Sequence, residues 1–279
     1  MEILAPLGKL EYLDKIIESG ADAVYAGVSG LSSRPESADL SIEEFKQAIR
    51  YAHSKGCKVY AALNACIPQR KISDAVLIAE KLDRMGADAI ILAEYGIIPI
   101  LAEQLNHSKI HASTLLGVYN SETIELLKRY GVSRIVLSSD MFIDEMAELI
   151  RRNNDVEYEI IAAGGICYQC NRQCRLPHGI WNGQYHVACQ NQYELLEEGE
   201  KVGVAHKIGA PSVRLYTALG LYCAMGISSF KIEGRTNRSE DVCQRIDELN
   251  GARGFLNTRQ KEMAGYLHYV SRYLEGLKC

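Results

Sequence analysis

The sequence predicts an α/β fold, a TIM-like (β/α)8 barrel, and three observations support this prediction. Eight short strand candidates alternate with helical patterns along the chain, which favours a barrel over a doubly wound sheet. The strand candidates are nearly all apolar, as expected of strands that are covered on both faces. The length of 279 residues suits one such barrel, so we expect a single domain over residues 1–279.

The strand candidates come in two groups. A Gly-containing turn followed by a short, largely apolar strand occurs at 20–27, 86–93, 131–138 and 226–233. In each, we expect a helix to end at the glycine and the next strand to follow at once. The other strand candidates are 2–5, 58–63, 109–112 and 158–163, and helical patterns cover 42–53, 72–85 and 121–130. Ser41 and Ser121, each with a glutamate close behind, are expected to be helix N-caps.

One segment is too long for an ordinary barrel loop. Residues 164–227, between the seventh and eighth strands, are expected to form a cysteine-rich insertion over the barrel mouth, where barrel active sites lie. The segment also contains a possible extra strand at 212–216. After Arg235 the chain is expected to be helical to its end.

Composition excludes several classes of protein. With 47% hydrophobic and 24% charged residues, the chain has the make-up of a soluble globular protein. The net charge of -4 gives no overall basic field toward nucleic acid, although a local basic patch stays possible. No window of 18 apolar residues predicts a membrane span. Nine cysteines without an export signal indicate a reducing, cytoplasmic location.

Four of the cysteines lie within 23 residues, at Cys167, Cys170, Cys174 and Cys189. Four thiolates suit a [4Fe–4S] cluster, whereas a zinc site usually takes two well-separated pairs of ligands. Spacing alone leaves zinc open. A nucleophilic cysteine with a histidine base is less favoured, because four neighbouring cysteines exceed what one nucleophile requires. For Cys57 and Cys243 we expect inert, buried thiols.

Polar residues stand at or just beyond the carboxyl ends of the expected strands. Because such positions converge on one pocket in a barrel, they are the candidate site. Each of these residues also has a purely structural interpretation. Some are expected simply to cap helices. A lone histidine in an apolar strand is often structural, and a Glu/Arg pair can be only an ion pair. The residues are Asn64, Glu94, His111, Ser113, Ser138, Asp140, Glu233 and Arg235.

Several segments resemble one family in the right order. Residues 2–8 followed by 20–27 resemble the opening of the peptidase U32 family, the collagenase-like proteases. Later motifs of this family resemble 33–34, 51–53, 58–64 and 111–114, and Phe230–Arg235 looks like its FKIEGR signature. The resemblance runs from residue 2 to about 245.

The resemblance implies a TIM-like barrel and, in the better-studied branches, a four-cysteine [4Fe–4S] site. Those branches hydroxylate tRNA or rRNA pyrimidines or the ubiquinone ring without oxygen, some drawing the oxygen atom from prephenate, and other members are named as peptidases. Cys167, Cys174 and Cys189 match the first three cluster cysteines of the family. The usual fourth position falls on Arg214, so Cys170, Cys223 and Cys66 are the alternatives for the fourth ligand.

Two other positions depart from the family pattern. Ala163 stands where the family usually has a histidine, and Ser139-Asp140 stand where it has Arg-Glu. These departures weaken the transfer of any particular substrate from the family to this chain.

The resulting hypothesis is an iron–sulfur enzyme that hydroxylates or oxidises a ring or small substrate without oxygen. His111, Glu233 and Asn64 form the expected catalytic set, with His111 and Glu233 as acid/base or orienting groups. Substrate binding is expected at Glu94 and at Arg34 and Arg235, the two arginines holding an anionic group.

Two alternatives remain. One is a peptidase, and the other is a cluster- or zinc-bearing accessory subunit of a longer homologue. Expected partners are a small-molecule or ring substrate, a prephenate-like oxygen donor and an oligomer with a family member. Nucleic acid stays open as a substrate.

Overall fold

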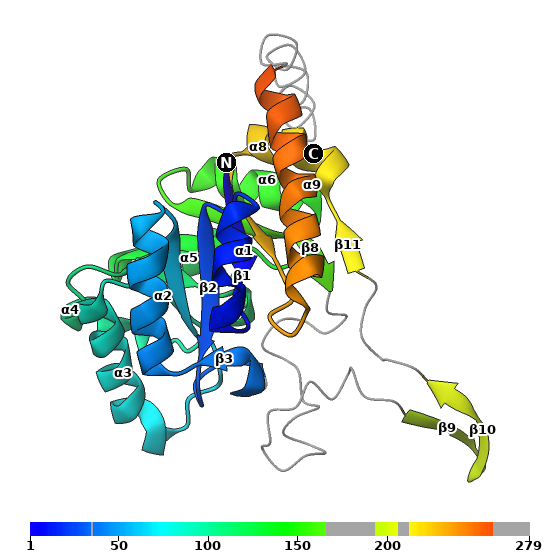
Figure 1. The fold of residues 1–279 in the computed structure, drawn as a ribbon, viewed down its shortest axis with the longest axis horizontal. Helices are drawn as coiled ribbons and strands as arrows, with labels where there is room; N and C mark the ends of the chain where they lie inside the picture. The colour runs from blue at the N-terminus through cyan, green and yellow to red at the C-terminus, as the bar shows by residue number, and fades with distance from the viewer. Residues whose placement is uncertain (35, 166–192, 206–211, 259–279) are drawn as a thin grey trace.

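The predicted barrel is confirmed. The computed structural model describes residues 1–34, 36–165, 193–205 and 212–258 (Figure 1). Eight parallel strands pair in a ring, and the pairing of β1 with both β12 and β2 closes it. The ring strands are β1 (Glu2–Pro6), β2 (Ala23–Val28), β4 (Lys58–Leu63), β5 (Ala89–Leu92), β6 (Lys109–Ala112), β7 (Val132–Val136), β8 (Glu157–Gly165) and β12 (Ile227–Ile232).

Four further strands lie outside this ring. Strand β3 (Asp39–Leu40) continues the sheet beside β2, and β11 (Ser212–Arg214) pairs antiparallel with the end of β8. The expected extra strand at 212–216 therefore exists but stops at Arg214. Strands β9 (Tyr193–Glu197) and β10 (Glu200–Ala205) form a separate antiparallel hairpin. The expected insertion thus includes a hairpin and a strand, and its residues 166–192, which hold the four cysteines, lie outside the described residues.

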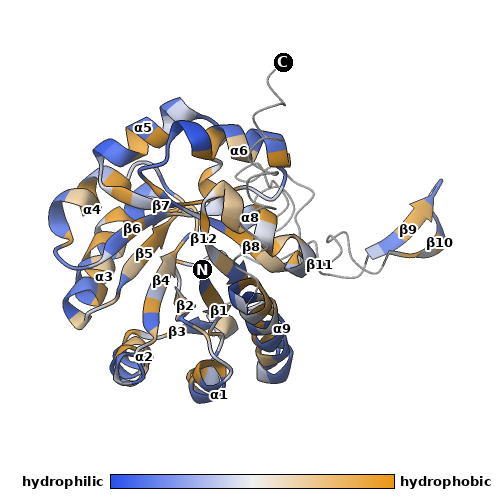
Figure 2. Cartoon of the chain, turned by 90° about the horizontal axis from the view of Figure 1, so that it is seen from above, coloured by the Kyte–Doolittle hydropathy of each residue, from blue (hydrophilic) through white to orange (hydrophobic). Residues whose placement is uncertain are grey.

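Helices surround the ring of strands, as Figure 2 shows from above. Helix α9 packs beside α1 and against β1, where the chain returns to its beginning. The α-helices are α1 (Leu13–Glu18), α2 (Ile42–Ser54), α3 (Ile72–Met85), α4 (Ile98–Gln104), α5 (Ser121–Arg129), α6 (Ile143–Arg152), α8 (Leu219–Met225) and α9 (Ser239–Thr258). Short 3-10 helices are η1 (Leu10–Tyr12), η2 (Glu36–Ala38), η3 (Gln69–Lys71), η4 (Thr114–Leu116) and η6 (Tyr216–Ala218). Among the described residues, no helix is both long and apolar enough to cross a membrane.

Local sequence signals explain where these helices begin and end. The Ser41 side chain accepts a hydrogen bond from the Glu44 N–H and the Glu44 carboxylate accepts one from the Ser41 N–H, so α2 starts with a capping box, as expected. The expected cap at Ser121 is wrong, because Asn120 caps α5 through its side-chain oxygen. Helix α3 ends at Gly86, whose left-handed backbone (φ +91°) disfavours other residues.

The barrel has two cores. The larger one fills the space between the strands and the helices. The smaller one lies inside the ring and comes from β1, β2, β4 and β5, through Leu4, Ala23, Tyr25, Tyr60, Ala62, Ala89 and Ile91. The other half of the interior is polar, with side chains from β6, β7, β8 and β12, namely His111, Arg134, Glu159, Ser229 and Lys231.

Candidate functional site at the barrel mouth

The carboxyl ends of the ring strands and the loops that follow them form the barrel mouth. An Arg–Glu pair lies there: Arg34 Nη2 is 2.8 Å from Glu233 Oε1. The two side chains are 30% and 22% exposed, so both remain partly reachable from solvent. The second oxygen of Glu233 accepts a hydrogen bond from the Gly165 N–H at 3.3 Å. Glu233 therefore joins the ends of β8 and β12 to the loop that carries Arg34.

A second ion pair lies beside the first and is fully buried. Arg235 Nη1 donates to Asp39 Oδ1 at 2.9 Å, and the side chains are 3% and 1% exposed. Ser32 Oγ donates to the same Asp39 oxygen at 2.6 Å and accepts from Arg235 at 3.2 Å. A Cβ on Gly27 would lie 1.7 Å from Arg235 Nη1, so the pair requires glycine at that position. We expected Arg235 to bind substrate, but its burial against Asp39 makes it a support for the loop.

Asn64 also supports this loop. Its Oδ1 accepts a hydrogen bond from the Ser33 N–H at 3.1 Å, and the neighbouring Ala65 N–H donates to the Leu31 carbonyl at 3.0 Å. These bonds hold the segment just before Arg34. The geometry thus gives Asn64 a positioning role, in place of the catalytic one expected from its place in the sequence.

Two hydrogen bonds hold the backbone of the FKIEGR motif, Phe230–Arg235, one from β2 and one from α9. Tyr25 donates from its hydroxyl to the Ile232 carbonyl at 3.0 Å, and Arg245 of α9 donates to the Glu233 carbonyl at 2.8 Å. Burial, together with the Glu233 carboxylate, raises the pKa of Tyr25, so the phenol stays protonated and remains a donor. The position of Glu233 is therefore set by β2 and α9 as well as by its own strand.

A second cluster of polar side chains, Tyr119, Ser138 and Asp140, lies in the loops that follow β6 and β7. Tyr119 donates from its hydroxyl to Asp140 Oδ2 at 3.0 Å and lies 3.2 Å from Ser138 Oγ, which also bonds Asp140. Sequence analysis expected Ser138 and Asp140 at the mouth but missed Tyr119, because this residue lies in a loop beyond η4 and no pattern marks it. Ser113 is a cap: its Oγ accepts from the Leu115 N–H at 3.2 Å. Glu94, which directly follows Ala93 after β5, is partly buried.

His111 lies inside the ring and not in the group at the mouth. It is 1% exposed, and its ring meets Tyr60 edge-on with the centroids 5.0 Å apart. Within the part of the chain that the structure describes, neither ring nitrogen has a hydrogen-bond partner. Burial and the nearby charges of Arg134 and Lys231 hold the pKa of His111 well below its ordinary value, so the imidazole is neutral. Among the described residues no hydrogen bond joins His111 to Glu233, so the expected joint role of these two residues stays a prediction.

A charged network, which the sequence did not predict, lies in the lower part of the interior. Arg134 is 4% exposed and reaches Glu2 at 2.5 Å, Glu157 at 2.6 Å and Glu159 at 3.2 Å. Ser229 Oγ donates to both Glu2 and Glu159 at 3.0 Å. Burial opposes ionisation of Glu2, but hydrogen bonds and the charge of Arg134 prevail and lower its pKa. Lys58, Lys109 and Lys231 also pair with Glu2, Glu157 and Glu159 in turn, so each carboxylate of this network has a cationic partner.

The cysteines differ in their positions and in their exposure to solvent. Cys167, Cys170, Cys174 and Cys189 lie outside the described residues. Cys66 is exposed just beyond the end of β4. Cys223 lies on α8, partly buried against the outer core, and burial raises the pKa of its thiol. Cys57 is buried, and burial raises its pKa to about 12, which keeps it protonated.

No candidate ligand set for a metal ion arises within the described ranges, where no three His, Cys, Asp or Glu residues form a suitable group. Arg214, where the resemblance led us to expect a fourth cysteine, reaches Glu248 of α9 at 3.2 Å. Its side chain therefore takes part in an ion pair with the outer helix.

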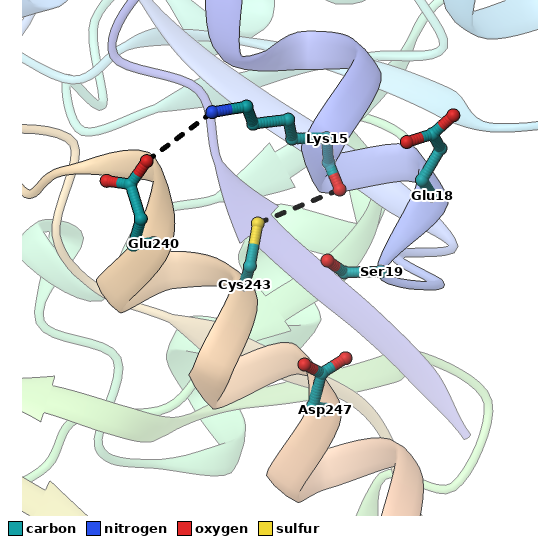
Figure 3. A pocket seen from close by; sticks show the side chains of 6 residues that line it. All are labelled: Lys15, Glu18, Ser19, Glu240, Cys243 and Asp247. Carbon is teal, nitrogen blue, oxygen red and sulfur yellow. Dashed lines mark hydrogen bonds and ion pairs between the residues drawn. The ribbon is translucent and has the colours of Figure 1, made fainter.

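A separate pocket of about 400 Å³ lies between α1 and α9 on the outside of the ring (Figure 3). Lys15 pairs with Glu240 at 3.4 Å, and Cys243 Sγ donates to the Lys15 carbonyl at 3.7 Å. Cys243 is only partly buried, so the expectation of a buried thiol is wrong here. Glu18, Ser19 and Asp247 complete the lining.

The profile of peptidase family U32 matches residues 8–263. A tRNA hydroxylation protein P of Helicobacter pylori is 31% identical over 269 residues, which cover 88% of this chain and 62% of the relative. The 23S rRNA 5-hydroxycytidine C2501 synthase of Escherichia coli is 28% identical over 84% of this chain and 36% of its own length. A collagenase of Porphyromonas gingivalis is 25% identical over 86% of this chain and 62% of its own length.

Among solved structures, the U32 peptidase Mk0906 superposes with a TM-score of 0.51 at 14% identity, over 58% of this chain and 69% of that one. This likeness concerns the fold alone. The chain spans about three fifths of the length of the Helicobacter relative (62%).

Proposed function

Because the chain belongs to peptidase family U32, we propose that it forms the catalytic barrel of an enzyme that hydroxylates a pyrimidine ring of RNA without oxygen. The relatives named as tRNA hydroxylation protein and as 5-hydroxycytidine synthase support this choice of reaction and substrate. The single observation of the structure that carries it is the half-buried Arg34–Glu233 pair at the mouth. The net charge of -4 means that RNA would be recognised by a local surface.

The Arg34–Glu233 pair offers a cation and a carboxylate to a pyrimidine nucleotide. The Glu233 carboxylate is oriented by Arg34 and by the Gly165 N–H, and it remains partly exposed. Such a carboxylate can accept a proton from the ring position that is hydroxylated, or orient the ring by hydrogen bonding. The Arg34 guanidinium can hold an anionic group, a phosphate or a carboxylate, with its fork of N–H donors.

The proposal includes a [4Fe–4S] cluster, with zinc as the alternative metal. Cys167, Cys170, Cys174 and Cys189 would supply its thiolates, and the cluster would supply electron transfer or activation of a bound oxygen group. One structural observation supports a position of the cluster at the barrel mouth. Strand β8 ends at Gly165, whose N–H bonds Glu233, and Cys167 follows two residues later.

Hydroxylation is favoured over peptide hydrolysis by the geometry of His111. A hydrolytic base must lie within hydrogen-bond reach of a nucleophile, yet neither nitrogen of His111 has such a partner among the described residues. Peptide cleavage that persists after iron is removed from the purified protein would reverse this preference.

The test compares RNA from cells with and without the gene. Total tRNA and rRNA are digested to nucleosides, and hydroxylated pyrimidines are measured by mass spectrometry. We expect one such nucleoside to disappear in the deletion strain and to return with the wild-type chain but not with Glu233→Gln. Glu240→Gln, which changes an exposed carboxylate on α9, is the matched control and should restore it. An unchanged nucleoside profile in the deletion strain would refute the proposal.

A further inference from the structure

An exposed aromatic side chain lies in the loop that follows β7, and the proposed function does not yet use it. Phe142 is 73% exposed, the largest fraction among the large apolar side chains of the described residues. The next residue, Ile143, is 41% exposed, and Tyr119 in the loop after β6 is 40% exposed. Because the Tyr119 hydroxyl bonds Asp140 at 3.0 Å, the two loops contact each other here. Phe142, Ile143 and Tyr119 are called the mouth patch below.

The fold itself gives no reason for an aromatic residue at Phe142. It is the N-cap residue of α6, where Ser, Thr, Asp or Asn normally accepts a hydrogen bond through its side chain, which phenylalanine cannot do. Its backbone N–H donates to Glu145 Oε2 at 2.8 Å, a bond that any residue but proline could make. Met141 and Met146, the two positions of a hydrophobic staple, are already buried. A bulky side chain that serves neither the cap nor the core indicates a functional position.

A carboxylate that can bind the edge of a base lies beside the mouth patch. Asp140 is two residues before Phe142, and it is exposed, whereas Ser138 behind it is buried. The hydroxyls of Tyr119 and Ser138 both bond Asp140, so the carboxylate is held in one place. A carboxylate offers about four acceptor positions, and it is the group that accepts from the N4 amino group of cytosine. Phe142 thus supplies a stacking face, and Asp140 supplies an acceptor for a base edge.

The charge of these loops favours contact with bases over contact with phosphates. Residues 113–120 and 137–142 include no lysine or arginine, and Asp140 is their one charged residue. The cation of the proposed site, Arg34, pairs with Glu233 after β12. Only β8 separates β7 from β12, a distance of about 10 Å between strand axes. One short RNA segment can therefore contact the mouth patch and the Arg34–Glu233 pair together.

We propose that Phe142 and Asp140 form a binding site for an unpaired base of RNA. The base stacks on the Phe142 ring and donates a hydrogen bond from its edge to the Asp140 carboxylate. Both contacts require a base that is unstacked and unpaired, as in a single-stranded loop, because a duplex hides base faces and pairs base edges. The inference rests on the proposed RNA substrate. It adds that the RNA is bound as a single strand, through its bases, on the β6–β7 side of the mouth.

The test measures the affinity of the purified full chain for a short, fluorescein-labelled pyrimidine RNA by fluorescence anisotropy, with the single strand and with its duplex. We expect the single strand to bind more tightly than the duplex. Phe142→Ala should weaken binding of the single strand about 5- to 150-fold, the range for loss of one base–aromatic stack. Phe142→Trp keeps a stacking face and should bind as the wild type does. Phe142→Leu is apolar but has no aromatic face, and it should bind nearly as weakly as the alanine variant.

Phe255→Ala is the matched control, because Phe255 is 58% exposed near the end of α9, on the outside of the barrel. This variant should bind RNA as the wild type does. The salt dependence of binding should be the same for Phe142→Ala and the wild type, since no cation is removed. Equal affinity of Phe142→Ala and the wild type would overturn the proposal, and so would an equal loss in Phe142→Ala and Phe255→Ala. Wild-type affinity of Asp140→Ala would refute the role of Asp140.

Two further outcomes separate this site from other interpretations. If the wild type self-associates in sedimentation and Phe142→Ala abolishes this without a change in RNA affinity, the mouth patch binds a second copy and the proposal is wrong. If deletion of the gene removes a hydroxylated pyrimidine but the Phe142 variants bind RNA normally, this site is refuted and the proposed function stands. If instead the variants bind as expected and deletion changes no nucleoside, the base-binding site is supported and hydroxylation is refuted.

Discussion

Replacement of His111 by phenylalanine should remove one component of the acid sensitivity of this fold. The folded pKa of His111 lies well below the ordinary 6.5, so the group is neutral when folded and binds a proton when unfolded in acid. Its stabilising contribution is fully present above pH 6.5 and is lost as the pH falls toward the folded pKa. Between pH 6.5 and about pH 5.5 the loss amounts to about 1 kcal/mol for one proton.

His111→Phe should cost little at alkaline pH. The ring nitrogens of His111 have no hydrogen-bond partner in the described ranges, so phenylalanine breaks no described hydrogen bond and keeps the edge-on contact with Tyr60. We therefore expect the variant to lie within about 1 kcal/mol of the wild type near pH 8, or above it.

Urea unfolding at a series of pH values measures both effects. The free energy of unfolding of the wild type should fall relative to the variant by about 1 kcal/mol from pH 6.5 to about pH 5.5. Because other titrating groups are common to both proteins, the difference isolates His111. Parallel pH profiles would show that folding does not lower the pKa of His111, and the reasoning from its burial would then be wrong.

Three further substitutions follow from the structure. Gly27→Ala should destabilise the fold by about 3–5 kcal/mol, measured by urea unfolding, because the new Cβ would separate the buried Arg235–Asp39 pair; an unfolding free energy within about 1 kcal/mol of wild type would contradict this. Asn120→Ala should cost about 1 kcal/mol through loss of the cap of α5, and a change in the melting temperature checks it. Cys223→Ala should leave the iron content of anaerobically purified protein unchanged, since Cys223 packs against the outer core; loss of iron from the folded variant would identify it as a ligand.

The fold could be predicted from sequence because its signals are local. The ring strands fall at the expected places, and α2 and α3 begin at Ile42 and Ile72 as the periodicity indicates. A helix-ending glycine and a short strand are set by neighbouring residues, and eight repetitions leave few alternatives to a closed barrel. The wrong prediction of the N-cap of α5 also has a local cause. Asn120 and Ser121 are both good N-cap residues, and the sequence does not rank them.

The site was harder to predict because position along a strand does not determine depth in the barrel. Glu233 and His111 both belong to strand-end motifs, yet Glu233 reaches the mouth and His111 packs on Tyr60 inside the ring. The strand tilt shifts each strand relative to its neighbours, so equal distance from a strand end does not mean equal height. Asn64 and Arg235 show the second difficulty. Both are at the mouth, but their partners, Ser33 and Asp39, make them supports for Arg34's loop.

The buried charge network could not be predicted from the sequence, because its partners lie on different strands of the barrel. In sequence, Arg134 and Glu159 look like single polar interruptions of apolar strands, and Glu2 looks like an exposed first residue. Closure of the ring brings Glu2 to Arg134 across 132 residues of sequence. A lone buried charge would be prohibitively unfavourable, whereas this network leaves each charge with an opposite partner. The same closure brings Lys231 to Glu159, an ion pair that the FKIEGR motif alone does not predict.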